Sequence, residues 1–126
     1  MKRVKDITQY IHSTLSTTEA EYVAACSAGQ EIIWMRSLLS ELGYAFTAPS
    51  RLLMDNQSAL QVAKKNPEHH GRMKHLDLRY FWLRHQIQSG TIQPEYVPTQ
   101  EMAADMLTKS LPKPAIEKFR RMMGLL

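Results

Sequence analysis

The chain has 126 residues and a formal net charge of +4, a size that allows one domain and hardly two. Its composition is 44% hydrophobic and 22% charged, with no apolar run long enough to cross a bilayer and no N-terminal leader, so we expect a soluble, intracellular chain without a membrane partner. Cys26 is the only cysteine, which excludes an internal disulfide and a cysteine-based zinc cluster.

The first predicted elements are a strand and a long helix. Alternating side chains favour a strand over Ile7–Leu15. Residues 16–18 then offer N-caps to a helix that we expect to end at Gly43. Residues at helical spacing are expected to face the core: Tyr22, Ala25, Cys26, Gly29, Ile32, Ile33 and Leu39.

A strand that runs directly into a helix is predicted next. The apolar residues 52–54 stop at Asp55, and a helix follows through Ala59, Leu60 and Ala63. A buried strand that hands over to a helix is typical of α/β proteins. We therefore assign the chain to the α/β class.

A helix followed by a second strand is predicted in the second half. After a loop over 66–71, a helix over Lys74–Ser89 is expected to end at Gly90 and to turn these side chains inward: Leu76, Tyr80, Leu83 and Ile87. A second strand is predicted over Thr91–Val97.

Two helices are expected after this strand. The first begins at Pro98 and Thr99 and holds Met102, Ala103, Met106 and Leu107. The second begins at Pro112 and carries an apolar face of Ile116, Phe119 and Met123.

The positive charge of the chain is concentrated in its middle. Residues 51–90 hold seven Lys and Arg against three acids, and seven minus three gives the whole excess of four. This stretch is the natural place for a nucleic-acid backbone, although a solvated basic helix face fits the charge equally well. The expected phosphate contacts are Lys64, Lys65, Arg72, Lys74, His75, Arg79 and Arg84. A zinc site is less favoured, because no cysteine accompanies the histidines of this stretch: His69, His70, His75 and His85.

Three acids stand near strand ends or helix starts, where open α/β sheets build their sites: Glu21, Asp55 and Asp105. If they converge, they offer the oxygen ligands that two magnesium ions need, with the ions about 3.5–4 Å apart. Such a pair of ions activates water to attack a phosphodiester.

Each acid also has a purely structural interpretation. Glu21 could complete a capping box with Thr18, unless Ser16 and Glu19 form the box one register earlier. Asp55 could be only the N-cap of the next helix, and Asp105 could be a solvated helix residue.

Five strings in one order carry a family resemblance: STTEAEYVA at 16–24, DNQSA at 55–59, KHLDLRY at 74–80, VPT at 97–99 and ADMLTK at 104–109. This ordered set resembles the ribonuclease H segment that ends the Pol polyprotein of copia-type retrotransposons, over about residues 13–126.

The resemblance implies a ribonuclease H-like fold, a mixed five-stranded sheet in the order 3-2-1-4-5 with helices on both faces. It also implies cleavage of the RNA strand of an RNA–DNA hybrid with two magnesium ions, in a polyprotein with an upstream reverse transcriptase. By motif, Glu21, Asp55 and Asp105 look like the second, third and fourth family carboxylates, and residues 72–79 look like the lead into the helix beside the hybrid.

The sequence departs from the family pattern at its start. The family's first catalytic Asp lies upstream of the STTE segment, and the surroundings of Asp6 do not resemble that motif. The loop that carries a product-release histidine in cellular ribonucleases H is also absent, since residues 97–99 run straight into the last catalytic helix.

We therefore expect a partial ribonuclease H-like domain over 1–111, without the first two strands, and a helical tail over 112–126. Catalysis is expected to be impaired. The alternatives are a non-catalytic nucleic-acid-binding remnant or a protein-interaction domain.

Overall fold

The computed structural model describes residues 17–64 and 77–125. Its elements follow in the order α2 (Thr17–Glu41), β1 (Ser50–Met54), α3 (Gln57–Lys64), α4 (Asp77–Gln88), β2 (Ile92–Tyr96), the 3₁₀ helices η3 (Thr99–Glu101) and η4 (Ala103–Leu107), and α5 (Lys113–Met122). The strand expected over Ile7–Leu15, the loop over 66–71 and the start of the helix from Lys74 lie outside the described residues.

The long helix α2 ends where the sequence predicts. Gly43 has φ +95°, a left-handed conformation that glycine adopts without a Cβ penalty. Its N–H donates to the Ser40 carbonyl over 3.0 Å, and the Tyr44 N–H donates to the Leu39 carbonyl over 2.9 Å. Both bonds satisfy carbonyls that the end of a helix would otherwise leave open, so the prediction that Gly43 ends this helix is confirmed.

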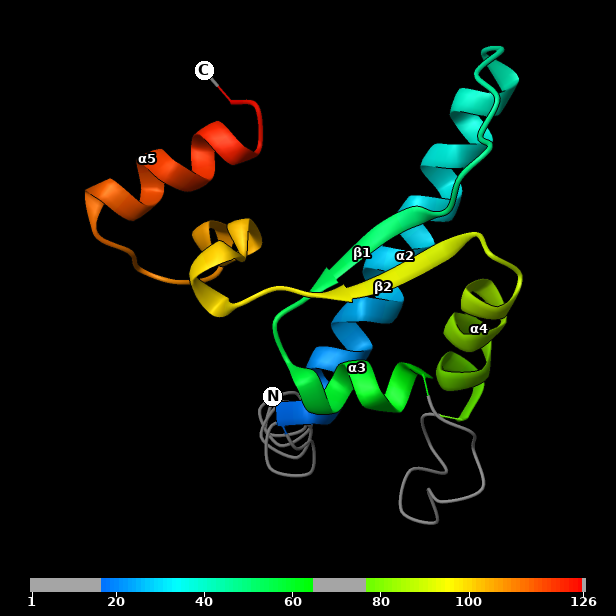
Figure 1. Cartoon of the computed structure of the whole chain (residues 1–126), viewed down its shortest axis with the longest axis horizontal. Coiled ribbons are helices and arrows are strands. Elements are labelled where there is room, and N and C mark those ends of the chain that lie inside the picture. Colours follow the sequence, from blue (N-terminus) through cyan, green and yellow to red (C-terminus); the bar gives the residue numbers. More distant parts are fainter. Residues whose placement is uncertain (1–16, 65–76, 126) are drawn as a thin grey trace, which may run out of the picture.

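The two strands form a parallel pair. Their register places Ser50 opposite Ile92 and Met54 opposite Tyr96, and the Val97 N–H extends the pairing to the Met54 carbonyl over 2.9 Å. In Figure 1, α2 passes behind the strands, and α3 and α4 lie along the connection between them. The predicted α/β class is confirmed. In the described part of the chain the sheet has two strands, and the five-stranded ribonuclease H-like order stays a prediction.

One continuous core lies between the base of α2, the helices α3 and α4, and one face of the sheet. Its buried members are Tyr22, Ala25, Cys26, Leu52, Met54, Ala59, Leu60, Ala63, Tyr80, Leu83 and Ile92. Helices α2 and α4 approach closely at Gly29, where an added Cβ would lie 3.1 Å from the Trp82 ring and 3.3 Å from a Leu83 methyl. A glycine is therefore what allows the two helices to pack at this distance.

Hydrogen bonds also join these two helices. The Tyr22 hydroxyl donates to the Tyr80 carbonyl over 3.1 Å, and the Cys26 thiol donates to the Arg79 carbonyl over 3.4 Å. Burial raises the pKa of the Cys26 thiol to about 11, so this buried side chain is held as the neutral thiol at physiological pH.

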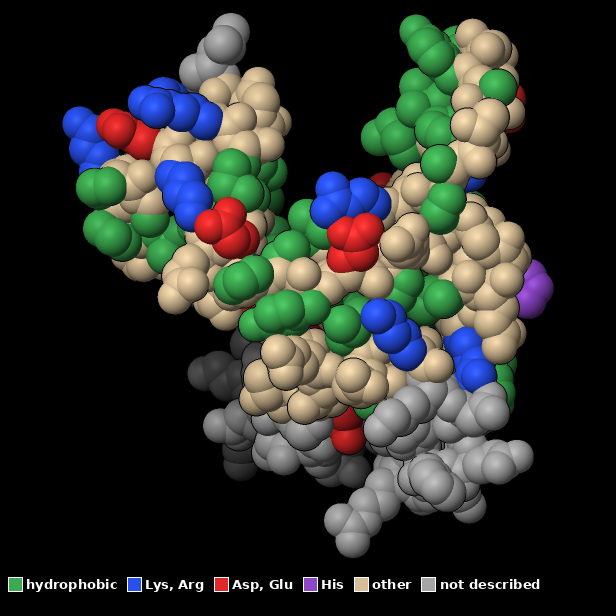
Figure 2. Space-filling view, in the orientation of Figure 1, with side chains coloured by type: hydrophobic (Ala, Val, Ile, Leu, Met, Phe, Trp, Pro, Cys, Tyr) green, Lys and Arg blue, Asp and Glu red, His purple; other side chains and the backbone are tan. Residues whose placement is uncertain are grey.

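The outer half of α2, residues 30–41, extends beyond the core together with the returning segment 42–49. Of the residues predicted to face inward here, Ile32, Ile33 and Leu39 are only partly buried. Several large apolar side chains are exposed: Trp34, Met35, Leu38, Leu42, Tyr44 and Phe46. Figure 2 shows hydrophobic side chains gathered along this projecting part of the molecule.

The segment after β2 differs from the prediction of one helix. Met102 has φ −81° and ψ +91°, an extended conformation that separates η3 from η4. The turns are 3₁₀, as the Asp105 N–H donates to the Met102 carbonyl over 3.1 Å. Leu107, one of the apolar residues of the predicted helix, is 70% exposed.

The last helix forms as predicted after Pro112, but its apolar face is only partly buried. Phe119 is buried, whereas Ile116 and Met123 are exposed. Helix α5 packs on η4, and Lys118 joins it to η3 through a 3.0 Å ion pair with Glu101. The division into a domain over 1–111 and a tail over 112–126 stays a prediction.

Candidate active site

Asp55 follows directly on the last residue of β1. Its carboxylate is partly buried, and it is not the cap of the next helix. Asn56 has that role, because its Oδ1 accepts the Ala59 N–H over 2.8 Å. The interpretation of Asp55 as only an N-cap is therefore wrong.

Asp105 lies on η4 and is the one buried charged residue in the described part of the chain, with 9% of its surface exposed. Its Oδ2 accepts a 2.9 Å charged hydrogen bond from the Lys109 ammonium, four residues later. The interpretation of Asp105 as a solvated helix residue is wrong. A buried carboxylate requires such a partner, because it has lost most of its hydration.

Glu21 lies near the start of α2 and is partly buried. Because the described helix begins at Thr17, Thr18 is already helical and cannot be its N-cap. The alternative capping box, between Ser16 and Glu19, would need Ser16 as the N-cap, and Ser16 lies outside the described residues.

The three acids are electrostatically coupled. Burial raises the pKa of Glu21 above its ordinary value, and the negative charges of Asp55 and Asp105 raise it further. The positive charge of Lys109 acts in the opposite direction on the same pKa. The charges that act on Glu21 therefore come from segments far apart in the sequence, the end of β1 and η4, and the convergence of the three carboxylates on one cleft stays a prediction.

Lys109 is a member of this group that the sequence prediction did not include. Its pKa is raised first by the hydrogen bond to Asp105 and also by the charges of Asp105, Asp55 and Glu21. One signal could have found it, the spacing of four residues from Asp105, at which opposite charges commonly pair along a helix. We call Glu21, Asp55, Asp105 and Lys109 the acidic cluster.

The acidic cluster suits magnesium by its donor atoms but not by its arrangement. Carboxylate oxygens are the ligands that magnesium prefers. Within residues 17–64 and 77–125, however, no three acidic, histidine or cysteine side chains are arranged to hold one metal ion. The cation that Asp105 contacts is instead the Lys109 ammonium.

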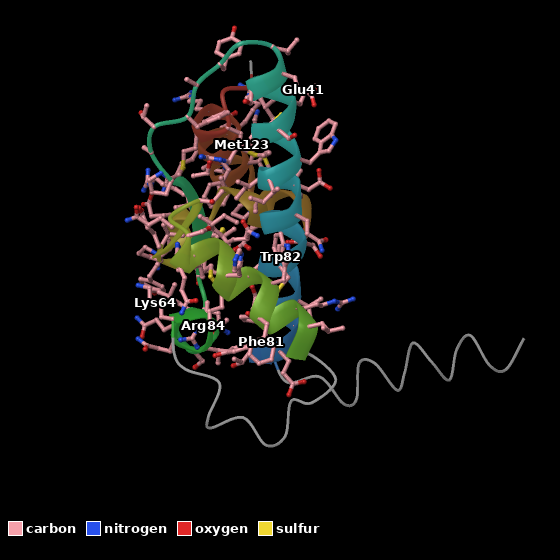
Figure 3. The ribbon with its side chains drawn as sticks, turned by 90° about the vertical axis from the view of Figure 1, so that its right-hand side faces the viewer. Glu41, Lys64, Phe81, Trp82, Arg84 and Met123 are labelled. Carbon is pink, nitrogen blue, oxygen red and sulfur yellow. The ribbon has the colours of Figure 1, made fainter. Side chains whose placement is uncertain are left out.

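Of the residues predicted to contact phosphates, three are described. Lys64 ends α3, and Arg79 and Arg84 lie on α4, which packs against α3. Lys64 and Arg79 are exposed, whereas Arg84 is partly buried and donates to the Tyr80 hydroxyl over 3.5 Å. In the view of Figure 3, Lys64 and Arg84 lie toward the same edge of the molecule.

The other four predicted contacts lie outside the described residues: Lys65, Arg72, Lys74 and His75. The same holds for three of the histidines considered for zinc, His69, His70 and His75, while His85 is exposed on α4.

Sequence comparison places the chain among transposon relatives. It is 40% identical, over 88% of its length, to the retrovirus-related Pol polyproteins from transposon TNT 1-94 of Nicotiana tabacum and from transposon RE2 of Arabidopsis thaliana. It is 39% identical over 87% of its length to that from transposon RE1 of Arabidopsis thaliana. The chain spans only 8% of the length of the first two and 7% of the third.

No family model matches the chain, and neither does any solved structure. Among the helices of the described residues, none combines the length and the apolar character needed to cross a bilayer.

Proposed function

We propose that this chain is the part of a copia-type Pol polyprotein that carries three carboxylates of a ribonuclease H-like domain, whose substrate is the RNA strand of an RNA–DNA hybrid. The observation that carries the proposal is the place of Asp55 directly after β1 together with the burial of Asp105 on η4, two acids whose charges also raise the pKa of Glu21. The similarity to retrovirus-related Pol polyproteins supports it, because it covers most of the chain.

A structural role alone accounts poorly for this arrangement. Placing Glu21 where burial and the negative charges of Asp55 and Asp105 raise its pKa costs folding free energy, and such costs are commonly kept at functional sites. Asp55 also stands at the carboxyl end of a parallel strand, the edge at which open α/β sheets bind their ligands.

Magnesium is the cofactor that the proposal implies. When bound, it would supply an activated water and stabilise the leaving oxygen. Because the described carboxylates do not form a metal site as they stand, we derive no step through the ion. We propose that Glu21, Asp55 and Asp105 are its ligands in the complete domain, and that the isolated chain is impaired.

Cleavage of a labelled RNA–DNA hybrid tests this proposal. The chain should be assayed alone, and as a chimaera in which it replaces the matched region of the Nicotiana tabacum Pol polyprotein, with the unaltered polyprotein in parallel. We expect the chimaera to cleave the hybrid in magnesium, and Asp55→Asn in the chimaera to reduce the rate by about 10²-fold or more. The isolated chain should show no turnover.

Two results would contradict the proposal. A chimaera that stays inactive beside an active parent polyprotein would argue against the ribonuclease H role. Turnover by the isolated chain that Asp55→Asn abolishes would show that the chain is not impaired.

Nucleic acid is the partner that we propose for the basic residues of α3 and α4. Lys64 and Arg79 are exposed and can reach phosphates, and such contacts weaken steeply as salt rises. Arg79→Glu should weaken hybrid binding and reduce the slope of log affinity against log salt by about 1. Arg120→Glu, an exposed arginine on α5, is the matched control and should change binding less. Equal effects of the two changes, or binding that does not vary with salt, would contradict a phosphate contact at Arg79.

A further inference from the structure

The outer half of α2 presents a second apolar face to solvent, which continues into the turn that follows the helix. Its exposed members are Trp34, Met35, Leu38 and Leu42. With 3.6 residues per turn, these positions fall within about 100° of the helix circumference, and the exposed Glu31 lies in the same arc. Ile32 and Ile33 lie on other sides of the helix and pack against the core. The outer half therefore has one apolar face toward the core and another that is exposed.

Helix α5 presents an apolar edge of its own. Phe119 is buried, whereas Ile116 and Met123 are 40% and 41% exposed. The exposed Arg120 follows Ile116 by four residues and precedes Met123 by three, so these three side chains share one side of the helix. The exposed edge of α5 thus combines two apolar side chains with one cation.

The two exposed faces carry opposite charges that are not paired. Lys118 of α5 forms an ion pair with Glu101, but within residues 17–64 and 77–125 neither Glu31 nor Arg120 forms one. An acid lies within the apolar face of α2, and an arginine lies within the apolar edge of α5. Two such surfaces are complementary in charge as well as in apolar character, and charge complementarity fixes the register of a contact.

The fold keeps these two faces apart within one chain. Figure 1 shows α5 and the outer half of α2 at opposite ends of the strands, and Figure 2 shows the surface hollowed between them. Helix α5 is held in this place by the burial of Phe119 and by the 3.0 Å ion pair of Lys118 with Glu101 on η3. A contact between the two faces therefore requires a second chain.

We propose that α5 of a second copy of this chain docks on the outer half of α2, with the partner's Arg120 facing Glu31. In a two-fold symmetric pair each copy supplies both faces, so the same contact forms twice and the dimer closes. Removal of the apolar side chains from water drives the association, and the opposite charges set its register. The inference does not rest on the proposed ribonuclease H role.

Sedimentation equilibrium of the full chain over a range of concentrations measures the dimer. Because a contact between two short helical segments is small, we expect a Kd on the order of 10⁻⁴ M. The chain is then a monomer at the low concentrations of unfolding experiments and a dimer in concentrated solution.

Charge reversal tests the register of the contact. Glu31→Arg and Arg120→Glu each place like charges opposite one another at both contacts, so each variant alone should dimerise at least about tenfold more weakly. An equimolar mixture of the two variants should form a dimer again, because each contact then joins opposite charges. Both side chains are exposed, so circular dichroism should show the unaltered fold.

A leucine pair tests the apolar part of the contact. Leu42→Ser, at a 67% exposed position in the proposed contact, should weaken the dimer about tenfold. Leu78→Ser makes the same change at an 87% exposed position on α4, outside the contact, and should leave the dimer as it is.

A chain that stays monomeric into the millimolar range overturns the proposal, and its two exposed faces would then be left for other parts of a Pol polyprotein. A dimer that both charge reversals leave intact also overturns it, as does a mixture of the two variants that stays monomeric. If a charge-reversal variant fails to fold, equal dimerisation of Leu42→Ser and Leu78→Ser overturns it. Cleavage of RNA enters none of these results.

Discussion

The two halves of α2 belong to one helix but have different environments. In the base, residues 17–29, Tyr22 and Cys26 are almost fully buried against α4 and the sheet. In the outer half, Trp34 is 58% exposed and Met35 is 47% exposed. The helix is equally regular in both halves, so its formation does not depend on complete burial. The burial of an apolar side chain depends instead on whether another element lies within reach.

The outer half is nevertheless held to the rest of the chain by polar contacts. Arg36 donates to the Ala48 carbonyl over 3.1 Å and to Ser50 Oγ over 2.9 Å, and its guanidinium lies 4.5 Å from the centre of the Phe46 ring. These contacts fix the returning segment where β1 begins. The base is therefore stabilised mainly by apolar packing, whereas the outer half combines the packing of Ile32 and Ile33 against the core with directed polar contacts.

The largest expected effect is the loss of stability when a leucine side chain is shortened to alanine, and it should differ between the two halves of α2. Leu83→Ala, at a fully buried position against the base, should lower the free energy of unfolding by about 2–5 kcal/mol. Leu38→Ala, at a 38% exposed position in the outer half, should cost less than about 1 kcal/mol. Urea unfolding followed by circular dichroism measures both. Similar losses would mean that the outer half is packed against something in solution.

A smaller effect on stability, one that depends on pH, is expected from Glu21 at the base of α2. The pKa of Glu21 is raised in the fold, first by burial and then by Asp55, so the folded chain holds this proton more tightly than the unfolded chain. The stability contributed by this proton is present below the unfolded pKa, near the ordinary value of 4.5, and is lost as the pH rises through the folded pKa.

Glu21→Gln should therefore stabilise the chain at neutral pH, by roughly 0.5 kcal/mol after allowance for solvent screening of a partly exposed group. The gain should vanish below about pH 4, since Glu21 is then protonated in both states. Glu31→Gln, at an exposed position in the outer half, is the matched control. Thermal melts at a series of pH values measure this difference, and a gain that persists in acid would refute the assignment to Glu21.

Local signals in the sequence predicted much of the fold. Gly43 has no Cβ, and the run at 52–54 is apolar and followed by an acid, so both features could be recognised without tertiary information. Periodicity also identified the buried positions at the base of α2. It was less informative for Leu39, which is only partly buried and is not among the side chains packed on the core, because a helical pattern does not reveal whether a partner element is present.

The site was less accessible to sequence reasoning. The positions of Asp55 and Asp105 follow from elements that could be recognised, but the extended conformation of Met102 could not, since no proline or glycine marks it. Lys109 was missed because a lysine close to an acid in sequence usually forms a solvated pair. The burial of Asp105 makes this pair different, and burial is a property of the tertiary structure.

The parallel pairing of β1 with β2 has a consequence for the order of folding. Ser50 pairs with Ile92, so the paired residues are 42 positions apart in the sequence (92 minus 50). Formation of this pair must close a long loop, and such long-range strand pairing is intrinsically slow. Asp55 directly follows one of the paired strands and Asp105 lies in the segment after the other. The long-range pairing therefore involves the two segments that carry the charges acting on Glu21.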